Sequence, residues 1–139
     1  MYQRESLGLE EARIAIEAML REASKEPNRP VAMAIVDSQG QLISFARMDG
    51  GLPINQEMAI KKASTAAQIG VDTAVFGQAL PAMNMAITDF GCTPLTTVQG
   101  GLCARKTDAG TVVGGIGVSG RMAQEDEQIA RAGLSALKL

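Results

Sequence analysis

Residues 31–50 read VAMAIVDSQGQLISFARMDG and carry the clearest local structural pattern of the chain. Its first part, Val31 to Val36, is an uninterrupted apolar run that is too short for a helix and predicts a buried strand. Asp37 to Gly40 has the composition of a turn, because Asp can accept a hydrogen bond from the backbone two residues on and Gly tolerates a positive φ. Gln41 to Met48 then alternates between two faces, as a half-buried strand does. The stretch therefore predicts an antiparallel hairpin.

Helical periodicity surrounds this hairpin on both sides. Apolar residues recur every three to four positions in three long segments and, less regularly, in a short one that ends at Pro81. Glu10 and Glu11 fall in the first turn of the first segment, where the helix dipole favours acidic side chains. The four predicted helices are about Leu9 to Ser24, Asn55 to about Ile69, about Thr73 to Leu80, and about Ala123 to Leu137.

A second hairpin is predicted near the C-terminus. Arg105 to Gly110 reads as a polar turn, and Thr111 to Ser119 is an apolar strand with three glycines. Hairpin-linked strands imply a mostly antiparallel sheet, with the terminal helices covering one face, so the fold class is α+β. A chain of 139 residues suits a single domain, residues 1–139. Exposed sheet edges and small-residue helix faces favour a homo-oligomer.

The complete absence of histidine restricts the chemistry more than any residue that is present. It removes the commonest general base at neutral pH and the commonest ligand for zinc and haem iron. Cys92 and Cys103 are isolated from each other, so they are expected to be free thiols and cannot complete a zinc site. No carboxylate cluster has metal-ligand spacing, and no metal centre is expected.

Composition also excludes several classes of partner. The formal net charge is −2, and no basic run interleaves with aromatic residues, so nucleic-acid binding is not expected. No segment reaches the ~20 consecutive apolar residues of a membrane span, and the first residues lack a signal-peptide core. The expected location is therefore the cytoplasm.

Charged side chains at the end of the first hairpin form one candidate site. Arg47, Met48 and Asp49 end a strand and enter a Gly-rich loop, a position where small-molecule sites are commonly built. The alternative is a surface ion pair between Arg47 and Asp49, which is worth little energetically. Both interpretations stay open on the sequence alone.

Two further side chains are candidates for chemistry. Lys62 lies on a nearly apolar helix, where it would either snorkel to solvent, the favoured interpretation, or be a buried cation that needs an anion. Cys103 could act as a nucleophile only if a nearby cation such as Arg105 lowered its pKa.

The glycine-rich run GGIGVSG, residues 114–120, contains the GxGxxG pattern of dinucleotide-binding folds. That pattern requires the first βαβ unit of a parallel sheet, whereas this run lies inside a strand near the C-terminus with no second strand after it. Nucleotide binding is therefore disfavoured. Ser119 and Gly120 nevertheless lead into a helix N-terminus, where backbone amides and the helix dipole attract anions.

These motifs together resemble the GlcG/HbpS-like family, which includes haem-binding HbpS and the C-terminal domain of PduO adenosyltransferases. The segment from Ile35 to Gly50 resembles the family's VVDxxGxLxxFxRMDG motif. The likeness covers nearly the whole chain except Asp72 to Gln99. It continues through KASTA (62–66), GGL (100–102), GTVVGGIGVSG (110–120) and QEDEQIARAG (124–133).

The resemblance implies an α+β, profilin-like domain with a five-stranded antiparallel sheet flanked by helices, assembled into dimers to octamers. It also implies haem, corrinoid or other tetrapyrrole binding for some members. This chain departs from the family at Cys103, where the family has proline in GGLP, and at Arg121, where it has glycine in SGG. Together with the missing histidine, these changes favour an anionic small ligand over a conventional haem site.

Three functions are compatible with these observations. The first is binding of a tetrapyrrole or another anionic organic molecule. The second is a metal-independent tautomerase, isomerase or lyase acting on a carboxylated intermediate, with Lys62 or Asp49 as base and Arg47 or Arg121 as carboxylate clamp. The third is a structural accessory protein. The ligand-binding candidates are Arg47, Met48, Asp49, Lys62, Arg105, Ser119, Gly120 and Arg121, and the catalytic candidates are Lys62, Asp49 and Cys103.

Overall fold

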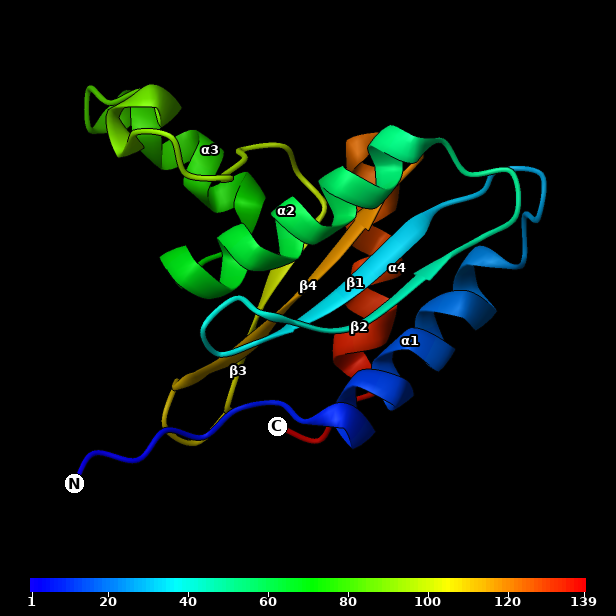
Figure 1. The fold of residues 1–139 in the computed structure, drawn as a ribbon, viewed down its shortest axis with the longest axis horizontal. Coiled ribbons are helices and arrows are strands. Elements are labelled where there is room, and N and C mark those ends of the chain that lie inside the picture. Colours follow the sequence, from blue (N-terminus) through cyan, green and yellow to red (C-terminus); the bar gives the residue numbers. More distant parts are fainter.

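Helices and strands follow one another as helix, hairpin, two helices, hairpin and helix in the computed structural model, which describes residues 1–139 (Figure 1). This order is the one predicted for an α+β domain. The elements are α1 (Leu9–Ala23), β1 (Ala32–Asp37), β2 (Leu42–Arg47), α2 (Pro53–Ile69), α3 (Thr73–Ala82), the 3-10 helix η1 (Ile87–Phe90), β3 (Gly101–Arg105), β4 (Val112–Ser119) and α4 (Ala123–Ser135).

Local sequence chemistry explains where these elements begin and end. The Asp37 carboxylate accepts hydrogen bonds from the backbone N–H groups of Gln39 and Gln41, both at 2.9 Å, which confirms the predicted turn between β1 and β2. Helix α2 begins at Pro53, two residues before the predicted start, because proline suits the first helical position. It ends at Gly70, which adopts a left-handed conformation with a φ of 83°.

The four strands form one antiparallel sheet in the order β2-β1-β4-β3. The fifth strand that the family resemblance implied is absent, so that expectation was wrong. Residues 91–100 pass from η1 to β3 without entering the sheet. Pro94 has no backbone N–H, and Gly91 and Gly100 adopt φ values of 78° and 128°, so this segment cannot continue an extended hydrogen-bonded ladder.

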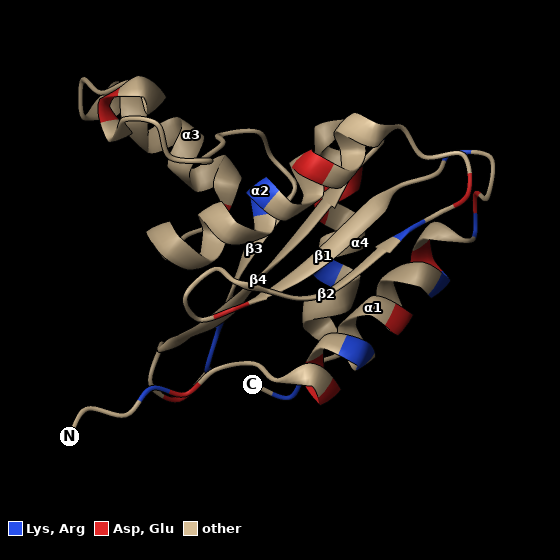
Figure 2. Cartoon of the chain, in the orientation of Figure 1, with Lys and Arg blue, Asp and Glu red and all other residues tan.

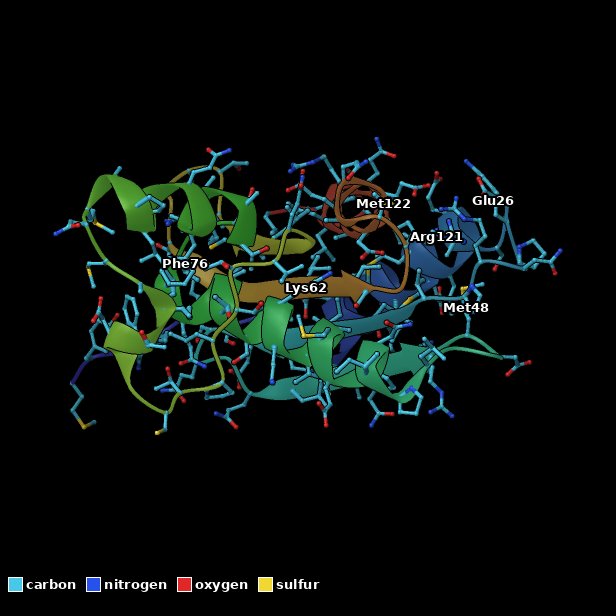
Figure 3. All side chains as sticks on the ribbon, turned by 90° about the horizontal axis from the view of Figure 1, so that it is seen from above. Glu26, Met48, Lys62, Phe76, Arg121 and Met122 are labelled. Atoms are coloured by element: carbon cyan, nitrogen blue, oxygen red, sulfur yellow. The ribbon has the colours of Figure 1, made fainter.

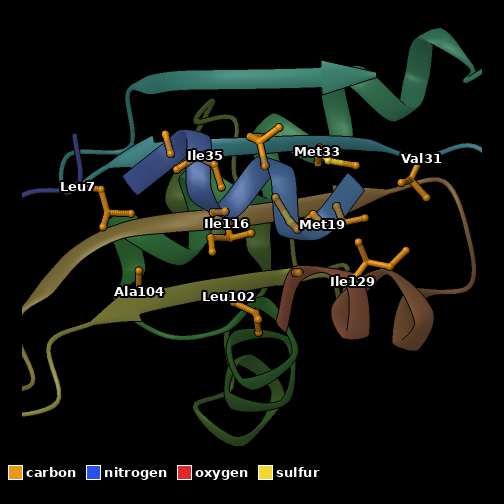
Figure 4. Packing of buried hydrophobic residues seen from close by; sticks show 14 of the residues in the cluster. Leu7, Met19, Val31, Met33, Ile35, Leu102, Ala104, Ile116 and Ile129 are labelled. Carbon is orange, nitrogen blue, oxygen red and sulfur yellow. The ribbon is translucent and has the colours of Figure 1, made fainter. Parts of the chain in front are cut away.

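Helices cover both faces of the sheet. Helices α1 and α4 pack on one face, as predicted for the terminal helices, against alternate residues of β1 such as Met33 and Ile35 (Figure 4). Helix α2 packs on the other face, where Ala32, Ala34 and Val36 meet its alanines. The alternation of β1 side chains therefore divides the core into a larger cluster of branched residues and methionines and a smaller cluster dominated by alanine.

The glycines of β4 allow α2 to approach the sheet closely. A Cβ atom built on Gly115 would lie 2.1 Å from the backbone oxygen of Ala63, and one on Gly117 would lie 2.1 Å from that of Ala59. The glycine-rich run is thus a packing surface inside an antiparallel strand. This agrees with the prediction that it is not a dinucleotide-binding loop.

The α3–η1 segment lies on the α2 side of the sheet, away from α1 and α4 (Figure 1). Phe76 and Phe90 pack edge to face with ring centroids 5.6 Å apart, which holds η1 against α3. Charged residues gather on α1 and in the loops, whereas the strands and α3 carry few (Figure 2). None of the helices has both the length and the apolar character that a membrane crossing would need.

Candidate functional site

The antiparallel register brings several predicted site residues to one end of the sheet. Ala32, the first residue of β1, pairs with both Arg47 at the end of β2 and Ser119 at the end of β4. Beside this end lies a cleft between α2 and the turn from β4 into α4, which we call the β4–α4 cleft. Its volume is about 320 Å³. It is lined by Asn55, Met58, Lys62, Val98, Ser119, Gly120, Arg121, Met122, Ala123 and Asp126.

A buried ion pair forms the floor of the β4–α4 cleft. Lys62 Nζ donates hydrogen bonds to Asp126 Oδ2 at 3.2 Å and to the backbone oxygen of Val118 at 2.8 Å. Only 2% of the Lys62 side chain and 3% of the Asp126 side chain are exposed. Figure 3 shows Lys62 on α2 above β4, with Met122 and Arg121 farther along toward the turn.

The favoured interpretation of a snorkelling Lys62 was wrong. The side chain points toward the sheet, where Gly100 leaves room for it, since a Cβ atom on that glycine would lie 2.8 Å from Nζ. A buried ammonium requires a partner, because transferring an unpaired charge out of water is costly. The partner is Asp126 of the chain itself, contributed by the first turn of α4.

Burial shifts both groups toward their neutral forms. It lowers the pKa of the Lys62 ammonium, and the negative charge of Asp126 and its hydrogen bond partly oppose this. It raises the pKa of the Asp126 carboxyl, which Lys62 and the backbone N–H groups of Arg121 and Gly120 oppose. Transfer of one proton from Lys62 to Asp126 converts the ion pair into an amine and a carboxylic acid without any exchange with solvent.

Helix α4 begins at the edge of the β4–α4 cleft. Met122 is its N-cap residue, and the Arg121 N–H donates to Asp126 Oδ1 at 2.9 Å. The first-turn N–H groups of a helix have no intrahelical acceptors, and the dipole there is positive. The cleft therefore combines a polar floor and a helix N-terminus with the apolar side chains of Met58, Val98 and Met122. Nowhere in the chain do three His, Cys, Asp or Glu side chains converge to hold a metal ion.

Arg121 borders this cleft, but its guanidinium is bound elsewhere. Nη2 donates to the backbone oxygens of Ala23 at 2.8 Å and Glu26 at 3.0 Å, and Nε donates to that of Arg29 at 2.8 Å. These carbonyl groups lie at and just beyond the C-terminal end of α1, where a cation is favoured. The guanidinium thus fixes the β4–α4 turn to α1, and in this arrangement it is occupied by the chain's own acceptors.

Arg121→Ala is expected to lower the free energy of unfolding by about 2 kcal/mol, because three carbonyl groups lose a charged donor. Arg121→Lys should recover only part of the loss, since a single ammonium lacks the planar fork that reaches several acceptors. Urea denaturation measures both. Arg131→Ala is the matched control, because Arg131 is 53% exposed and makes only long ion pairs of 3.8 and 3.9 Å. Equal losses at the two positions would contradict the role given to Arg121.

Arg47, Met48 and Asp49 lie outside the β4–α4 cleft. With Pro27 they line a separate, open groove of about 400 Å³. One interpretation of the sequence was a surface ion pair between Arg47 and Asp49. The structure does not contain this ion pair. The Met48 thioether accepts a long hydrogen bond from the Val31 N–H at 3.5 Å. The structure therefore brings Lys62 and Arg121 to one cleft but leaves Arg47 and Asp49 beside it.

Arg105 and Cys103 lie away from the β4–α4 cleft. Arg105 pairs with Val112 at the opposite end of the sheet, and its guanidinium donates to the backbone oxygens of Gly110 and Gly70. Cys103 is buried, and burial raises the pKa of its thiol despite the nearby Arg105. The thiol is therefore not activated as a nucleophile. Both cysteines are free, with Cys92 exposed.

Sequence reasoning overlooked Asp126 as a member of the site. In the sequence, Glu125, Asp126 and Glu127 are three consecutive acidic residues that all suit a helix N-terminus, and nothing in the local pattern separates the three. Lys62 could have pointed to Asp126, because a lysine that lies among alanines and does not reach solvent needs a buried anionic partner. Asn55, Met58 and Val98 were missed as lining residues because they come from segments with no polar motif.

Comparisons with known proteins agree on one family. The family model described as haem degrading protein HbpS-like matches residues 7–135. A double mutant of HbpS from Streptomyces reticuli has a solved structure that is 32% identical, with a TM-score of 0.87 over 100% of this chain and 92% of that chain. Another HbpS structure is 34% identical, with a TM-score of 0.87 over 100% and 95% of the two chains.

A further solved structure is that of PduOC in complex with haem. It is 26% identical to this chain, with a TM-score of 0.82 and coverage of 96% of both chains. No curated protein matches the chain significantly. The family match spans the sheet, all four α-helices and the β4–α4 cleft. The chain therefore belongs to the HbpS-like family.

Proposed function

We propose that this protein binds haem or a closely related tetrapyrrole, and that the β4–α4 cleft is the site. Membership of the HbpS-like family and the similarity to PduOC, which was solved as a haem complex, support a haem-related ligand. The observation that carries the choice of cleft is its composition: two methionines, a helix N-terminus and a buried lysine surround one hollow. The homo-oligomer and the cytoplasmic location expected from the sequence stay predictions.

The residues of the cleft suit haem without any histidine. Methionine thioethers are haem-iron ligands in proteins, and Met58 and Met122 both line the cleft. The first-turn amides of α4 suit a propionate group, because helix N-termini bind anions. Haem carries out redox and oxygen chemistry through its iron when bound. The chain's own contribution would be the thioether donor, the anion-binding amides and the apolar side chains around them.

The size of the cleft indicates how much of the ligand it can enclose. About 320 Å³ lies at the lower end of the range for ligand pockets, so the cleft would enclose one edge of a macrocycle. An apolar ring also needs apolar surface outside the cleft. Leu52, Ile54, Val98 and Met122 are exposed on the segments that border it and provide such surface.

Titration of the purified protein with hemin is expected to give a saturable shift of the Soret band. Met58→Leu combined with Met122→Leu removes both thioethers at nearly constant side-chain volume, and we expect it to weaken binding about tenfold or more and to change the Soret position. Met83→Leu is the matched control, because Met83 is an exposed methionine at the end of α3 and away from the cleft. Absence of saturable binding, or equal affinity in the double variant and the wild type, would overturn the proposal.

A further inference from the structure

The lysine on the floor of the β4–α4 cleft differs from every other lysine of the chain. Lys62 is buried and touches a buried carboxylate, whereas Lys25 and Lys106 pair with exposed glutamates at the surface. Its neighbour Lys61 is half-buried and forms no ion pair with any acidic residue. Lys62 is also the only lysine that lines this cleft. A primary amine in such a place is suited to covalent chemistry, because buried lysines form Schiff bases in enzymes.

We propose that Lys62 forms a reversible imine with a small α-oxo acid that enters the β4–α4 cleft, with Asp126 as the proton donor and acceptor. This inference goes beyond haem binding and does not depend on it, since it requires only that the cleft admit a small molecule. A volume of about 320 Å³ is enough to admit a compound of this size.

The ion pair already holds the protons that imine formation needs. An amine attacks a carbonyl carbon only when it is unprotonated, and loss of the hydroxyl group as water needs an acid nearby. Transfer of one proton across the 3.2 Å between Lys62 Nζ and Asp126 Oδ2 supplies both, namely a neutral amine and a carboxylic acid. Burial lowers the pKa of Lys62 and raises that of Asp126, and both directions favour this neutral pair.

The reaction balances without any oxidant or reductant. The Nζ lone pair forms the new C–N bond as the C=O π bond opens. The Asp126 carboxylic acid gives its proton to the carbonyl oxygen and takes one proton from the nitrogen, so that the product is a neutral carbinolamine and Asp126 is again a carboxylic acid. The nitrogen then expels the hydroxyl group, which leaves as water with the proton of the Asp126 carboxylic acid, while the nitrogen proton returns to the carboxylate. The products are one imine and one water for each carbonyl compound, and hydrolysis reverses the reaction.

The position of the α4 N-terminus is the reason for proposing a carboxylated carbonyl compound. The first-turn amides of α4 lie at its edge, beside Met122 and Ala123, and together with the positive end of the helix dipole they favour a carboxylate. The Lys62–Asp126 pair adds no net charge to the floor. A ketone without the carboxylate would reach the same amine but would lack this second point of attachment.

Reductive trapping of the wild-type protein tests the proposal. Pyruvate and sodium cyanoborohydride would convert the imine into a stable secondary amine, so that intact-mass measurement shows one added carboxyethyl group. Peptide mapping should place at least ten times more label on Lys62 than on Lys61, Lys25, Lys106 or Lys138. Acetone, which lacks the carboxylate, is the matched ligand control and should label Lys62 at least tenfold less. Label spread evenly over the lysines, or no label at all, would overturn the proposal.

Two variants separate the roles of the groups. Lys61→Ala should keep full labelling, and Asp126→Asn should slow trapping at Lys62 about 100-fold while retaining an acceptor for the Arg121 N–H. Unchanged trapping in folded Asp126→Asn would rule out Asp126 as the proton donor. Because the readout is the mass of a modified peptide, failure of trapping is distinct from failure of hemin to bind.

Discussion

Lys62→Met is expected to lower the free energy of unfolding by about 3–5 kcal/mol, because it leaves the Asp126 carboxylate buried without its cation. Asp126→Asn should cost a similar amount by leaving the Lys62 ammonium unpaired. The double variant is expected to lie much closer to the wild type than the sum of the two losses, since it removes both buried charges together. Urea denaturation of the four proteins at neutral pH measures the coupling.

Lys61→Met is the control for this cycle. Lys61 is adjacent in sequence and makes no ion pair, so its replacement should change stability by no more than about 0.5 kcal/mol. Additive losses in the double variant would mean that Lys62 and Asp126 do not stabilise each other, and the description of the cleft floor would then be wrong.

The difference in the free energy of unfolding between the wild type and the double variant should depend on pH in a direction that the pKa shifts predict. Burial raises the pKa of Asp126 above its usual 3.8, so between 3.8 and the raised value the folded protein binds more protons than the unfolded protein. The free energy of unfolding therefore falls as the pH rises through this range. Burial lowers the pKa of Lys62 below 10.5, so the unfolded protein binds more protons between the lowered value and 10.5, and stability rises with pH there. Relative to the double variant, the free energy of unfolding of the wild type should therefore fall as the pH rises from 3.8 through the raised pKa of Asp126. It should rise again between the lowered pKa of Lys62 and pH 10.5.

Gly117→Ala is expected to destabilise the protein by about 3 kcal/mol or more, because the added methyl group cannot be accommodated. Its Cβ atom would lie 2.1 Å from the backbone oxygen of Ala59 and 2.5 Å from the backbone nitrogen of Ala63. Both contacts are to helix backbone, which cannot move without lifting α2 from the sheet. Lys62 lies between these two alanines, so the same shift should also reduce hemin binding and imine trapping.

Gly8→Ala provides the comparison for this prediction. Its Cβ atom would meet only the end of the flexible Glu11 side chain, at 3.2 Å, and we expect a loss of about 1 kcal/mol or less. Thermal and urea denaturation of both variants measure the difference. If Gly117→Ala proved as mild as Gly8→Ala, the close approach of α2 to β4 would not be a determinant of this fold.

Most of the fold could be predicted because its signals are local. The apolar run from Val31, the turn at Asp37 and the alternation up to Met48 specify the first hairpin, and Gly70 marks the end of α2 through its left-handed conformation. The fifth strand came from the family resemblance alone. No local pattern in residues 91–100 supports a strand, and Pro94 together with the positive φ values of Gly91 and Gly100 disfavours one there.

The candidate site was less predictable because its central contacts join residues far apart in the chain. Lys62 and Asp126 are separated by 64 positions, and Arg121 reaches carbonyl groups up to 98 positions away. Sequence chemistry identified Lys62, Ser119, Gly120 and Arg121 as candidates but could not show that Arg121 donates to α1. It also could not place Arg47 and Asp49 in a separate groove, because strand register alone brings them to the same end of the sheet.

A crystal structure of the protein saturated with hemin would show directly whether the β4–α4 cleft is the ligand site. We predict electron density for the macrocycle against Met122 and Met58, with a propionate at the first turn of α4 above the Lys62–Asp126 pair. Haem bound in the groove of Arg47 and Asp49, or near Arg105 at the opposite end of the sheet, would contradict it.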